Sequence, residues 1–301
     1  YDEIHRRVQT FRVFLDGLRA SEGVSICSPA DLDSQVFERY REVNLIQLRD
    51  KRISPVTHKK RLETILGLMR WAWTNEYIDS LPRNLDGKYP RPEKGIERPS
   101  PEFFPIGVIQ QLFDASSQRT KLYIALALNC GWTAADIATL THDMLDRKTG
   151  VLSRDRNKTG VPTSFRLWEI TLSLLGTEMT PRSDGLMLLG QNGHPLIHQE
   201  ILPDGKPMAQ TSAIRLSFDR VRRKTGVLKG PGFKAFRKTS AQLIEQHFTT
   251  EPHLVDQFLG HAYGNRVREA YTTGSFGRIH EVCDWLGKQY DLTACVTGRP
   301  H

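Results

Sequence analysis

The sequence has few cysteines and no long apolar run. Its four cysteines are Cys27, Cys130, Cys283 and Cys295, and none forms a Cys-x-x-Cys pair or has a His at zinc-finger spacing. This pattern argues against a zinc module, and we expect reduced thiols and no bound metal. No apolar stretch approaches the ~20 residues of a membrane helix, and residues 1–7 are charged and unlike a signal peptide. We therefore expect a cytoplasmic protein with no membrane partner.

Acidic residues are fewer than basic ones. The chain has 42 Lys and Arg against 34 Asp and Glu, a net charge of +8 and a pI near 9.4. Such a balance favours a polyanionic partner such as nucleic acid, provided that the cations are clustered. The length of 301 residues predicts two domains.

The first 85 residues show helical periodicity. Apolar residues from Ile4 to Leu18 recur every three or four positions and predict an amphipathic helix, and a second pattern follows around Val36 and Tyr40. A third helix is predicted to open at Ser54-Pro55, because Ser caps a helix and Pro suits its first turn. Its expected buried stripe is Leu62, Ile65, Leu66, Met69 and Trp73.

The third helix also carries basic residues. His58, Lys59, Lys60, Arg61 and Arg70 are predicted on its other face and in its first turns, where they could neutralise DNA phosphates. An ordinary solvated helix face explains the same residues, since short basic runs are common on helices. The run by itself leaves both interpretations open.

A segment rich in Pro, Lys and Arg separates the two predicted domains. Six prolines between Leu81 and Pro105 exclude a continuous helix there. We therefore predict a helical domain over 1–85, a basic linker over 86–103, a second domain over 104–287 and a tail over 288–301. In the second domain we expect helices over 106–113, 122–128, 132–140, 169–175, 211–225, 233–246, 252–259 and 276–286.

A short β hairpin is expected within the second domain. Val151-Leu152 and Thr163–Leu167 flank the polar run Arg154–Gly160, so Lys158 is predicted near the hairpin tip. The predicted fold class is mainly α, with a helical first domain and a mostly helical second domain that holds a small antiparallel sheet.

The densest group of cations lies between Asp219 and Lys238. It comprises Arg220, Arg222, Arg223, Lys224, Lys229, Lys234, Arg237 and Lys238. Within it, Lys234 and Arg237 are three positions apart and are predicted on one helix face. The run Leu259-Gly260-His261 follows, and Tyr271 comes ten residues after the His.

This order of a basic pair, Leu-Gly-His and Tyr resembles the catalytic signature of tyrosine recombinases, the phage integrase family. The first domain resembles the core-binding (SAM-like) domain of that family in Arg52–Thr57 and the helix that follows. The similarity covers residues 35–285. It implies a clamp around double-stranded DNA, a homo-oligomer of four protomers on two DNA sites, and association with the nucleoid when bound. The face formed by Ile279, Val282 and Leu286 would then dock onto a neighbouring subunit.

The resemblance also implies a chemistry without metal or cofactor. Tyr271 would attack a DNA phosphodiester and form a 3′-phosphotyrosyl bond, as in site-specific recombination or integration of a mobile element. Arg237, His261 and Lys234 would contact the phosphate, with Lys234 at a position usually held by His, and Lys158 would protonate the leaving 5′ oxygen. The implied DNA-binding residues are Lys59, Lys60, Arg61, Arg70, Arg220, Arg223, Lys224 and Lys238.

One catalytic position departs from the family pattern. The run Gly131-Trp132-Thr133 has Thr133 where the family has its first catalytic Arg, while Asp136 keeps an acid in place of Glu. Three functions stay open: an active strand transferase in which Arg154 or Arg156 substitutes, a catalytically impaired DNA-binding accessory or regulatory protein, and a nicking enzyme similar to type I topoisomerases. The missing cation would lower the rate by about a hundredfold or more.

Overall fold

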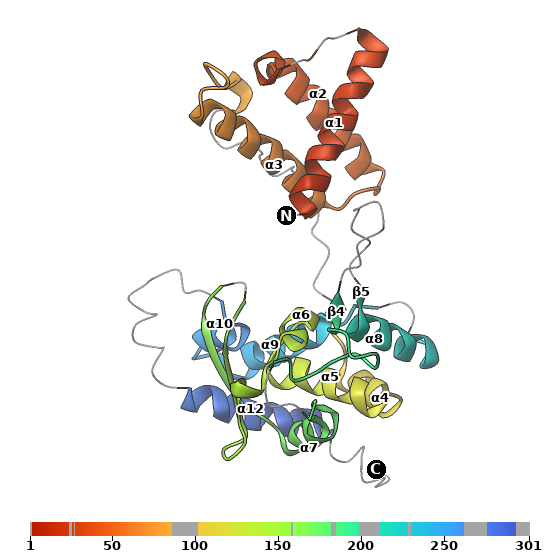
Figure 1. The fold of residues 1–301 in the computed structure, drawn as a ribbon, viewed down its shortest axis with the longest axis vertical. Helices are drawn as coiled ribbons and strands as arrows, with labels where there is room; N and C mark the ends of the chain where they lie inside the picture. Colours follow the sequence, from red (N-terminus) through yellow and green to blue (C-terminus); the bar gives the residue numbers. More distant parts are fainter. Residues whose placement is uncertain are drawn as a thin grey trace. The chain divides into compact units, whose positions relative to one another are not determined.

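The chain folds into two compact units, Tyr1–Ser100 and Pro101–His301 (Figure 1). The computed structural model describes residues 2–23, 26, 28–85, 102–157, 159–181, 185–198, 211–227, 230–261 and 276–292. Nearly all of the linker predicted over 86–103 lies outside these ranges. Within them, no helix combines the length and the apolar character that a membrane crossing requires.

The described part of the first unit consists of helices joined by loops. Its elements are α1 (Asp2–Glu22), η1 (Pro29–Asp31), α2 (Ser34–Arg49), α3 (Pro55–Thr74) and η2 (Arg83–Leu85). The predicted start of α3 is confirmed, because Ser54 Oγ accepts a hydrogen bond from the Thr57 amide at 3.1 Å and Pro55 occupies the first turn. The three long helices pack around a core of their own, to which Phe11, Tyr40 and Ile65 contribute.

The buried stripe of α3 ends differently from the prediction. Leu62, Ile65, Leu66 and Met69 are buried as expected, but Trp73 is 49% exposed. The small Ala72 takes the core position, three residues after Met69. Trp73 therefore points to solvent at the last turn of the helix and is not a core residue.

The basic face predicted for α3 is also smaller than expected. His58 is buried, with 5% exposure, so it cannot belong to a solvated face. Arg61 is half-buried and donates to Asn44 Oδ1 at 3.0 Å and Gln47 Oε1 at 2.8 Å. Its guanidinium links α3 to α2. Lys59, Lys60 and Arg70 remain exposed.

The second unit is helical with two small antiparallel sheets, so the predicted fold class is confirmed. Its elements are α4 (Ile106–Asp114), α5 (Gln118–Asn129), α6 (Ala134–Ala138), η3 (His142–Met144), β1 (Leu145–Asp146), β2 (Val151–Asp155), β3 (Pro162–Arg166), α7 (Glu169–Glu178), β4 (Ile197–His198), β5 (Thr211–Ser212), α8 (Ala213–Lys224), α9 (Ala235–His247), α10 (His253–Leu259) and α12 (Gly277–Tyr290).

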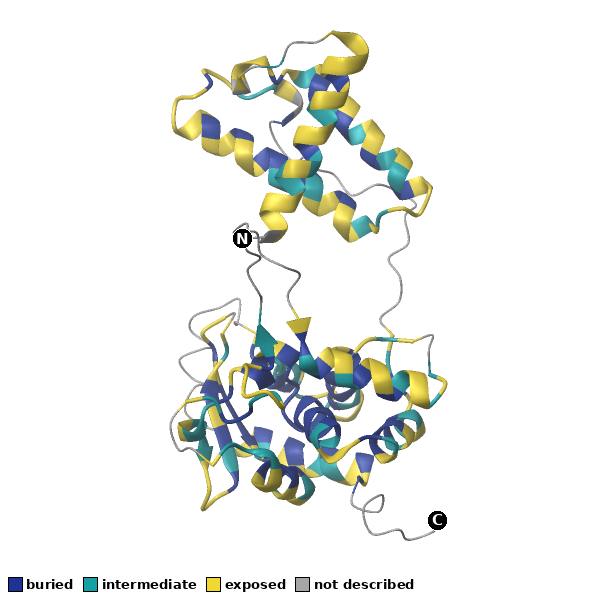
Figure 2. Ribbon diagram, turned by 45° about the vertical axis from the view of Figure 1, so that its right-hand side comes forward, coloured by how far each residue is buried: buried dark blue, intermediate teal, exposed yellow. Residues whose placement is uncertain are grey.

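Helix α5 forms the centre of this unit. Residues 122–128 are at most 1% exposed, and the helix is dark blue along most of its length in Figure 2. It contacts α4, α6, α7, α8, α9 and α12. Because apolar side chains cover α5 on all sides, it is a core helix rather than an amphipathic one, and it anchors the elements that carry the site.

The three-stranded sheet has the order β1-β2-β3, and β2 pairs with β3 from Val151↔Arg166 to Asp155↔Pro162. The predicted hairpin is therefore present, with a shorter bend than expected, since Arg154 and Asp155 belong to β2. The bend closes by hydrogen bonds from the Arg156 amide to the Val161 carbonyl and from the Gly160 amide to the Arg156 carbonyl. Gly160 has φ +66°, which suits a glycine.

Three helix predictions need correction. The helix expected over 211–225 begins only at Ala213, because Thr211–Ser212 form β5. The helix expected over 132–140 is only the five-residue α6, since Trp132 and Leu140 lie in the flanking turns. Helix α12 continues to Tyr290, beyond the expected helix end at 286, and Tyr290 is fully buried. Ile279, Val282 and Leu286 pack into the core of their own unit. That face is therefore not available for docking onto a neighbouring subunit.

Candidate active site

Arg237 is the most buried cation of the predicted site. It lies in the first turn of α9 with 4% exposure. Its Nη1 donates to the Gly131 carbonyl, and its Nη2 donates to the Leu259 carbonyl at 2.5 Å. Burial, with the nearby Arg156 charge, lowers the pKa of Arg237 to about 10, and Asp136 opposes the shift. Arg237 therefore stays charged at neutral pH.

The Arg237 contacts depend on Gly131, which has φ +61°. A Cβ on Gly131 would lie 2.6 Å from the Phe258 ring, which packs in the core. The backbone can turn here and present its carbonyl to Arg237 only because no side chain is present. The glycine before Trp132 in the sequence motif is thus explained by packing.

The C-terminal end of α10 receives two guanidinium groups. The Leu259 carbonyl accepts from both Arg237 Nη2 and Arg156 Nη1. Carbonyls in the last turn of a helix have no partner within the helix, and the helix dipole adds negative potential there. The two arginines satisfy this end of α10 and meet at one oxygen.

Gly260 ends α10 in the left-handed conformation, with φ 54° and ψ 41°. A Cβ at this position would be 2.9 Å from Thr163 Cγ2 and 3.0 Å from Arg156 Cδ. The glycine of the Leu-Gly-His run therefore lets the β hairpin lie directly against the end of α10. Thr159 Oγ1 in the hairpin bend also donates to the Gly260 carbonyl, at 2.9 Å.

His261 follows this turn and is held by Asp256 of α10. Its amide donates to the Asp256 carbonyl at 2.9 Å, and its Nδ1 lies 3.2 Å from Asp256 Oδ1. When Nδ1 donates to this carboxylate, Nε2 can donate to a phosphate oxygen only in the imidazolium form, in which both ring nitrogens carry a proton. The His261 side chain is about half exposed.

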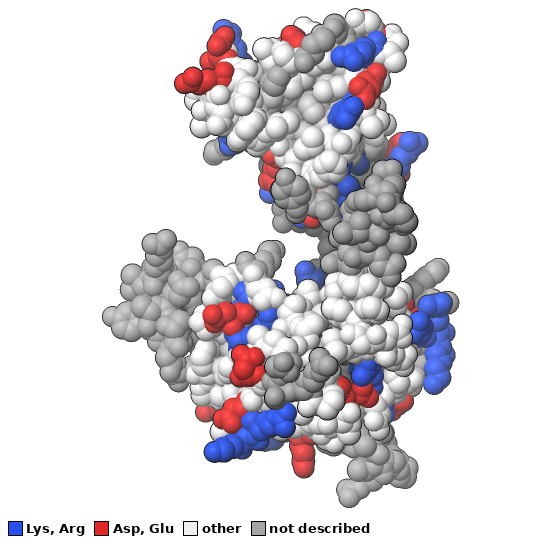
Figure 3. Space-filling model, viewed as in Figure 1, with Lys and Arg blue, Asp and Glu red and all other residues white. Residues whose placement is uncertain are grey.

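A cavity of about 490 Å³ collects these groups. Its basic lining residues are Arg156, Lys234, Arg237, Lys238 and His261, and Glu245 is the one acidic residue among the described residues that line it. In the view of Figure 3, Lys and Arg atoms are visible on the second unit near the positions of α9 and α10. Convergent cations on a small cavity can bind a phosphate group.

Lys234 and Arg237 occupy different structural positions. Lys234 is exposed and precedes α9 as its N-cap residue, whereas Arg237 is buried within the first turn. Both nevertheless line the same cavity. The three-residue spacing brings the two cations to one place, as the sequence indicated, with only one of them in the core.

Thr133 has a structural role in the described chain. It caps α6, with Thr133 Oγ1 donating to Asp136 Oδ2 at 2.7 Å and the Thr133 amide donating to the same oxygen at 2.9 Å. The Asp136 amide in turn donates to Thr133 Oγ1, which completes a capping box. Thr133 is not among the residues that line the cavity.

Arg154 and Arg156, the two hairpin arginines that could replace the missing catalytic Arg, have different environments. Arg154 is buried with 7% exposure and donates to the Asp136 carbonyl at 2.7 Å and to Thr139 Oγ1 at 3.1 Å. Arg156 is half-buried and lines the cavity. Sequence alone did not distinguish them, and it also missed Asp256, whose only signal is its place five residues before His261.

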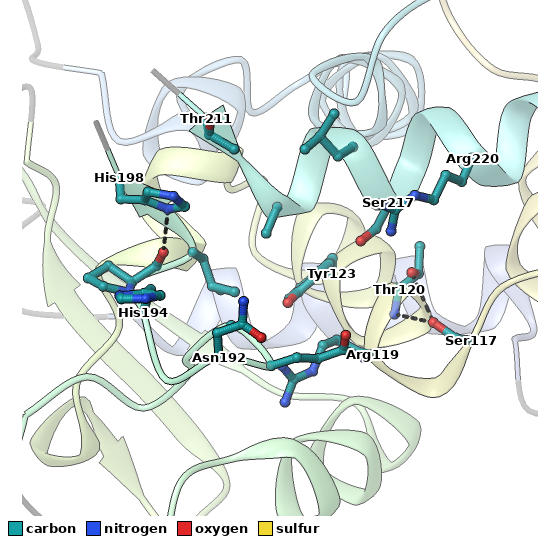
Figure 4. A pocket seen from close by; sticks show the side chains of 16 residues that line it. Ser117, Arg119, Thr120, Tyr123, Asn192, His194, His198, Thr211, Ser217 and Arg220 are labelled. Carbon is teal, nitrogen blue, oxygen red and sulfur yellow. Dashed lines mark hydrogen bonds between the residues drawn. The ribbon is translucent and has the colours of Figure 1, made fainter. Parts of the chain in front are cut away.

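Tyr271 and Lys158 are outside the described residues. Arg220 of α8 lines a second pocket of about 430 Å³, across from His194 and His198 (Figure 4). Two other predicted DNA-binding residues of α8 bond to the protein backbone. Lys224 Nζ donates to the Ala115 carbonyl at 3.3 Å, and Arg223 Nε donates to the Asp219 carbonyl at 3.2 Å. These α8 cations do not line the cavity around Arg237.

The chain has the fold of tyrosine recombinases. It is similar to a lambda integrase fragment solved as a dimer bound to a COC′ core site, with 16% identity, a TM-score of 0.58, and coverage of 91% of this chain and 90% of that one. It is also similar to the Tn1549 transposon integrase in complex with circular intermediate DNA, with 14% identity, a TM-score of 0.54, and coverage of 87% and 94%. No protein-family model and no curated protein matches the sequence.

Proposed function

We propose that this protein cleaves and rejoins duplex DNA through a 3′-phosphotyrosyl intermediate, as a site-specific recombinase or integrase. The observation that carries the proposal is the convergence of Arg156, Lys234, Arg237 and His261 on one cavity in a chain with the tyrosine recombinase fold. The lambda integrase and Tn1549 integrase structures described above hold DNA, which supports double-stranded DNA as the substrate.

The proposed reaction is a transesterification at phosphorus. Tyr271 Oη forms a bond to phosphorus, the bond from phosphorus to the 5′ oxygen breaks, and the phenolic proton passes to solvent. Lys158 gives a proton to the leaving 5′ oxygen, and Arg237 and His261 hold the non-bridging oxygens. Rejoining reverses these steps with a 5′-hydroxyl as nucleophile, so no co-reactant is consumed.

In this proposal, the first unit contributes to the binding of DNA. Lys59, Lys60 and Arg70 are exposed on α3 and can contact phosphates without reading bases. Assembly of four protomers on two DNA sites stays part of the proposal, and it rests on the resemblance, since the α12 face expected to mediate it is packed internally. The proposed location is the cytoplasm, with association with the nucleoid when the protein is bound to DNA.

A second function has a specific observation in its favour. Thr133 is absorbed into the cap of α6, so the position of the first catalytic Arg contributes no cation to the cavity. A protein that binds DNA as an accessory or regulatory factor, with impaired catalysis, fits that observation. No comparable observation favours a topoisomerase-like nicking enzyme.

Covalent trapping separates these functions. Nicked duplexes tiled across the DNA that flanks the gene are incubated with the native chain, Tyr271→Phe and Thr133→Arg, and adducts are resolved on a denaturing gel. The proposal expects an adduct with the native chain that is absent in Tyr271→Phe. An adduct only with Thr133→Arg supports the impaired DNA-binding protein. Duplex binding without an adduct in any protein refutes the strand-transferase proposal.

A further inference from the structure

The proposed reaction needs a second guanidinium beside Arg237. The phosphorane that forms in the transition state carries charge on its non-bridging oxygens, and preorganised cations stabilise it. Thr133 cannot provide one, because its side chain is neutral and bonded to Asp136 at 2.7 Å. Any replacement must come from another element that reaches the same cavity.

The β hairpin reaches it through Arg156. Arg156 Nη1 and Arg237 Nη2 donate to the same carbonyl oxygen, that of Leu259, so the two guanidinium groups are neighbours. Arg156 also lies 3.4 Å from the Gly260 carbonyl through the same nitrogen. Both side chains line the cavity that also holds Lys234 and His261.

Arg156 has donors to spare. A guanidinium has five N–H donors in a planar fork. The hydrogen bonds of the Arg156 side chain within the described residues all start at Nη1, and its Nε is buried without a partner there. Among the described residues, Nη2 therefore has no protein partner and remains for an anion in the cavity. Arg154 differs, because both of its Nη atoms and its Nε already donate to protein oxygens.

Two adjacent cations are unfavourable until an anion joins them. The Arg156 charge lowers the pKa of Arg237 and is the second cause of the shift after burial, because the two guanidinium groups meet at one carbonyl oxygen. A bound phosphate removes this repulsion and accepts from both forks. The arrangement is suited to a phosphate rather than to a structural ion pair.

We propose that Arg156 is the second phosphate-clamping arginine of this site and replaces the cation missing at Thr133, an inference that rests on the proposed function. Arg156 and Arg237 would then contact the non-bridging oxygens of the scissile phosphate, with the hairpin rather than the segment before α6 supplying the second arm. Gly260 contributes to this arrangement, because its lack of a side chain leaves room for Arg156 beside the end of α10.

The test is adduct formation by the full chain on the nicked duplex that traps the native protein. Arg156→Gln should lower the rate of adduct formation by about a hundredfold or more, while duplex affinity changes by less than about threefold. The matched control is Arg166→Gln, which removes one cation from the same hairpin at an exposed ion pair with Asp284. It should leave the adduct rate within about threefold of native.

Two further variants guard against misfolding. In Arg156→Ala, added ethylguanidinium should restore part of the adduct rate, which a merely unfolded hairpin would not allow. The double variant Thr133→Arg with Arg156→Gln should recover activity by returning a guanidinium to the site from the other element. Thermal melting of each variant reports folding separately from chemistry.

The outcomes distinguish this inference from the proposed function. A native adduct that survives in Arg156→Gln overturns the role of Arg156 and leaves strand transfer standing. An adduct only in Thr133→Arg overturns it too, since native Arg156 then fails to substitute. Absence of adducts in every protein on duplexes that they bind overturns both proposals. Loss of the adduct in Arg156→Gln, together with its recovery by ethylguanidinium in Arg156→Ala or by Thr133→Arg in the double variant, establishes the role of Arg156.

Discussion

The two units of this protein use similar cations in different ways. In the first unit, Lys59, Lys60 and Arg70 are spread along the exposed side of α3. In the second unit, cations from the β2–β3 bend and α9 converge on one cavity with a half-exposed His. The difference is one of preorganisation, because dispersed surface charges attract a polyanion whereas convergent, desolvated charges can act on one phosphate.

The strongest way to break this comparison is to remove the buried cation. Arg237→Ala should lower the rate of adduct formation by about a thousandfold, as loss of a transition-state arginine does elsewhere. It also leaves the carbonyls of Gly131 and Leu259 without this donor, so some loss of stability is expected. Single-turnover trapping at saturating protein measures the first effect and thermal melting the second.

The control for Arg237 is Lys238→Ala. Lys238 is the next residue and lines the same cavity but is exposed. We expect a change of less than about tenfold in adduct rate, because an exposed, solvated cation contributes less than a buried one. Equal losses in the two variants would contradict the assignment of the clamp to buried guanidinium groups.

Two glycines with left-handed backbone, Gly260 at the end of α10 and Gly160 in the hairpin bend, allow a matched comparison. Gly260→Ala should lower the free energy of unfolding by about 2 kcal/mol or more, because the left-handed backbone is strained with a Cβ and that Cβ meets Thr163 and Arg156. Gly160→Ala is matched to it, with φ +66° and no atom within 4 Å of the added Cβ. Gly160→Ala should lower the free energy of unfolding by about 1 kcal/mol.

Denaturant unfolding of the two glycine variants measures this difference. Gly260→Ala should in addition slow adduct formation, because Arg156 must move away from the Cβ. Equal destabilisation by both substitutions would show that the close approach of the hairpin to α10 has no energetic weight.

The surface cations of the first unit should affect binding alone. Replacing Lys59 and Lys60 together with Gln should weaken duplex binding by about tenfold at moderate salt and reduce the salt slope by about 2, since each phosphate contact contributes about 0.9. The rate of adduct formation at saturating protein should not change. Fluorescence anisotropy across a salt series reports the slope.

Arg61→Gln is the contrasting variant on the same helix. Its guanidinium is bonded to Asn44 and Gln47 at 3.0 and 2.8 Å, so its loss should lower stability rather than the salt slope. A fall in slope as large as that of a Lys substitution would place Arg61 on the DNA instead.

The smallest expected effect concerns Thr133. Thr133→Ala removes both halves of its side-chain contact with Asp136 and should lower the free energy of unfolding by about 1 kcal/mol, as for other N-caps. Its adduct rate, normalised for folded protein, should equal that of the native chain. A specific loss of activity would assign Thr133 a role at the phosphate that its capping contacts do not suggest.

Much of the fold followed from periodicity. The cap at Ser54-Pro55, a helix over 122–128 and the β hairpin are local features, so pattern and turn chemistry were sufficient for them. Predictions failed where a helix ends or faces a partner. Trp73 is exposed and His58 buried because packing against α1 and α2, not spacing along α3, decides which side chains are covered.

The candidate site likewise has features that the sequence predicted and features that only the tertiary structure showed. The residue types and order of Lys234, Arg237, Leu259-Gly260-His261 and Thr133 are properties of the sequence, which by itself determined the resemblance to tyrosine recombinases and the gap at Thr133. Only the tertiary structure decided that Arg156, not Arg154, lies beside Arg237. That choice depends on the approach of the hairpin to the end of α10, a contact between residues more than a hundred positions apart. No local pattern encodes it, because the hairpin is placed by its packing on α12, and α10 by its packing on α9 and α12.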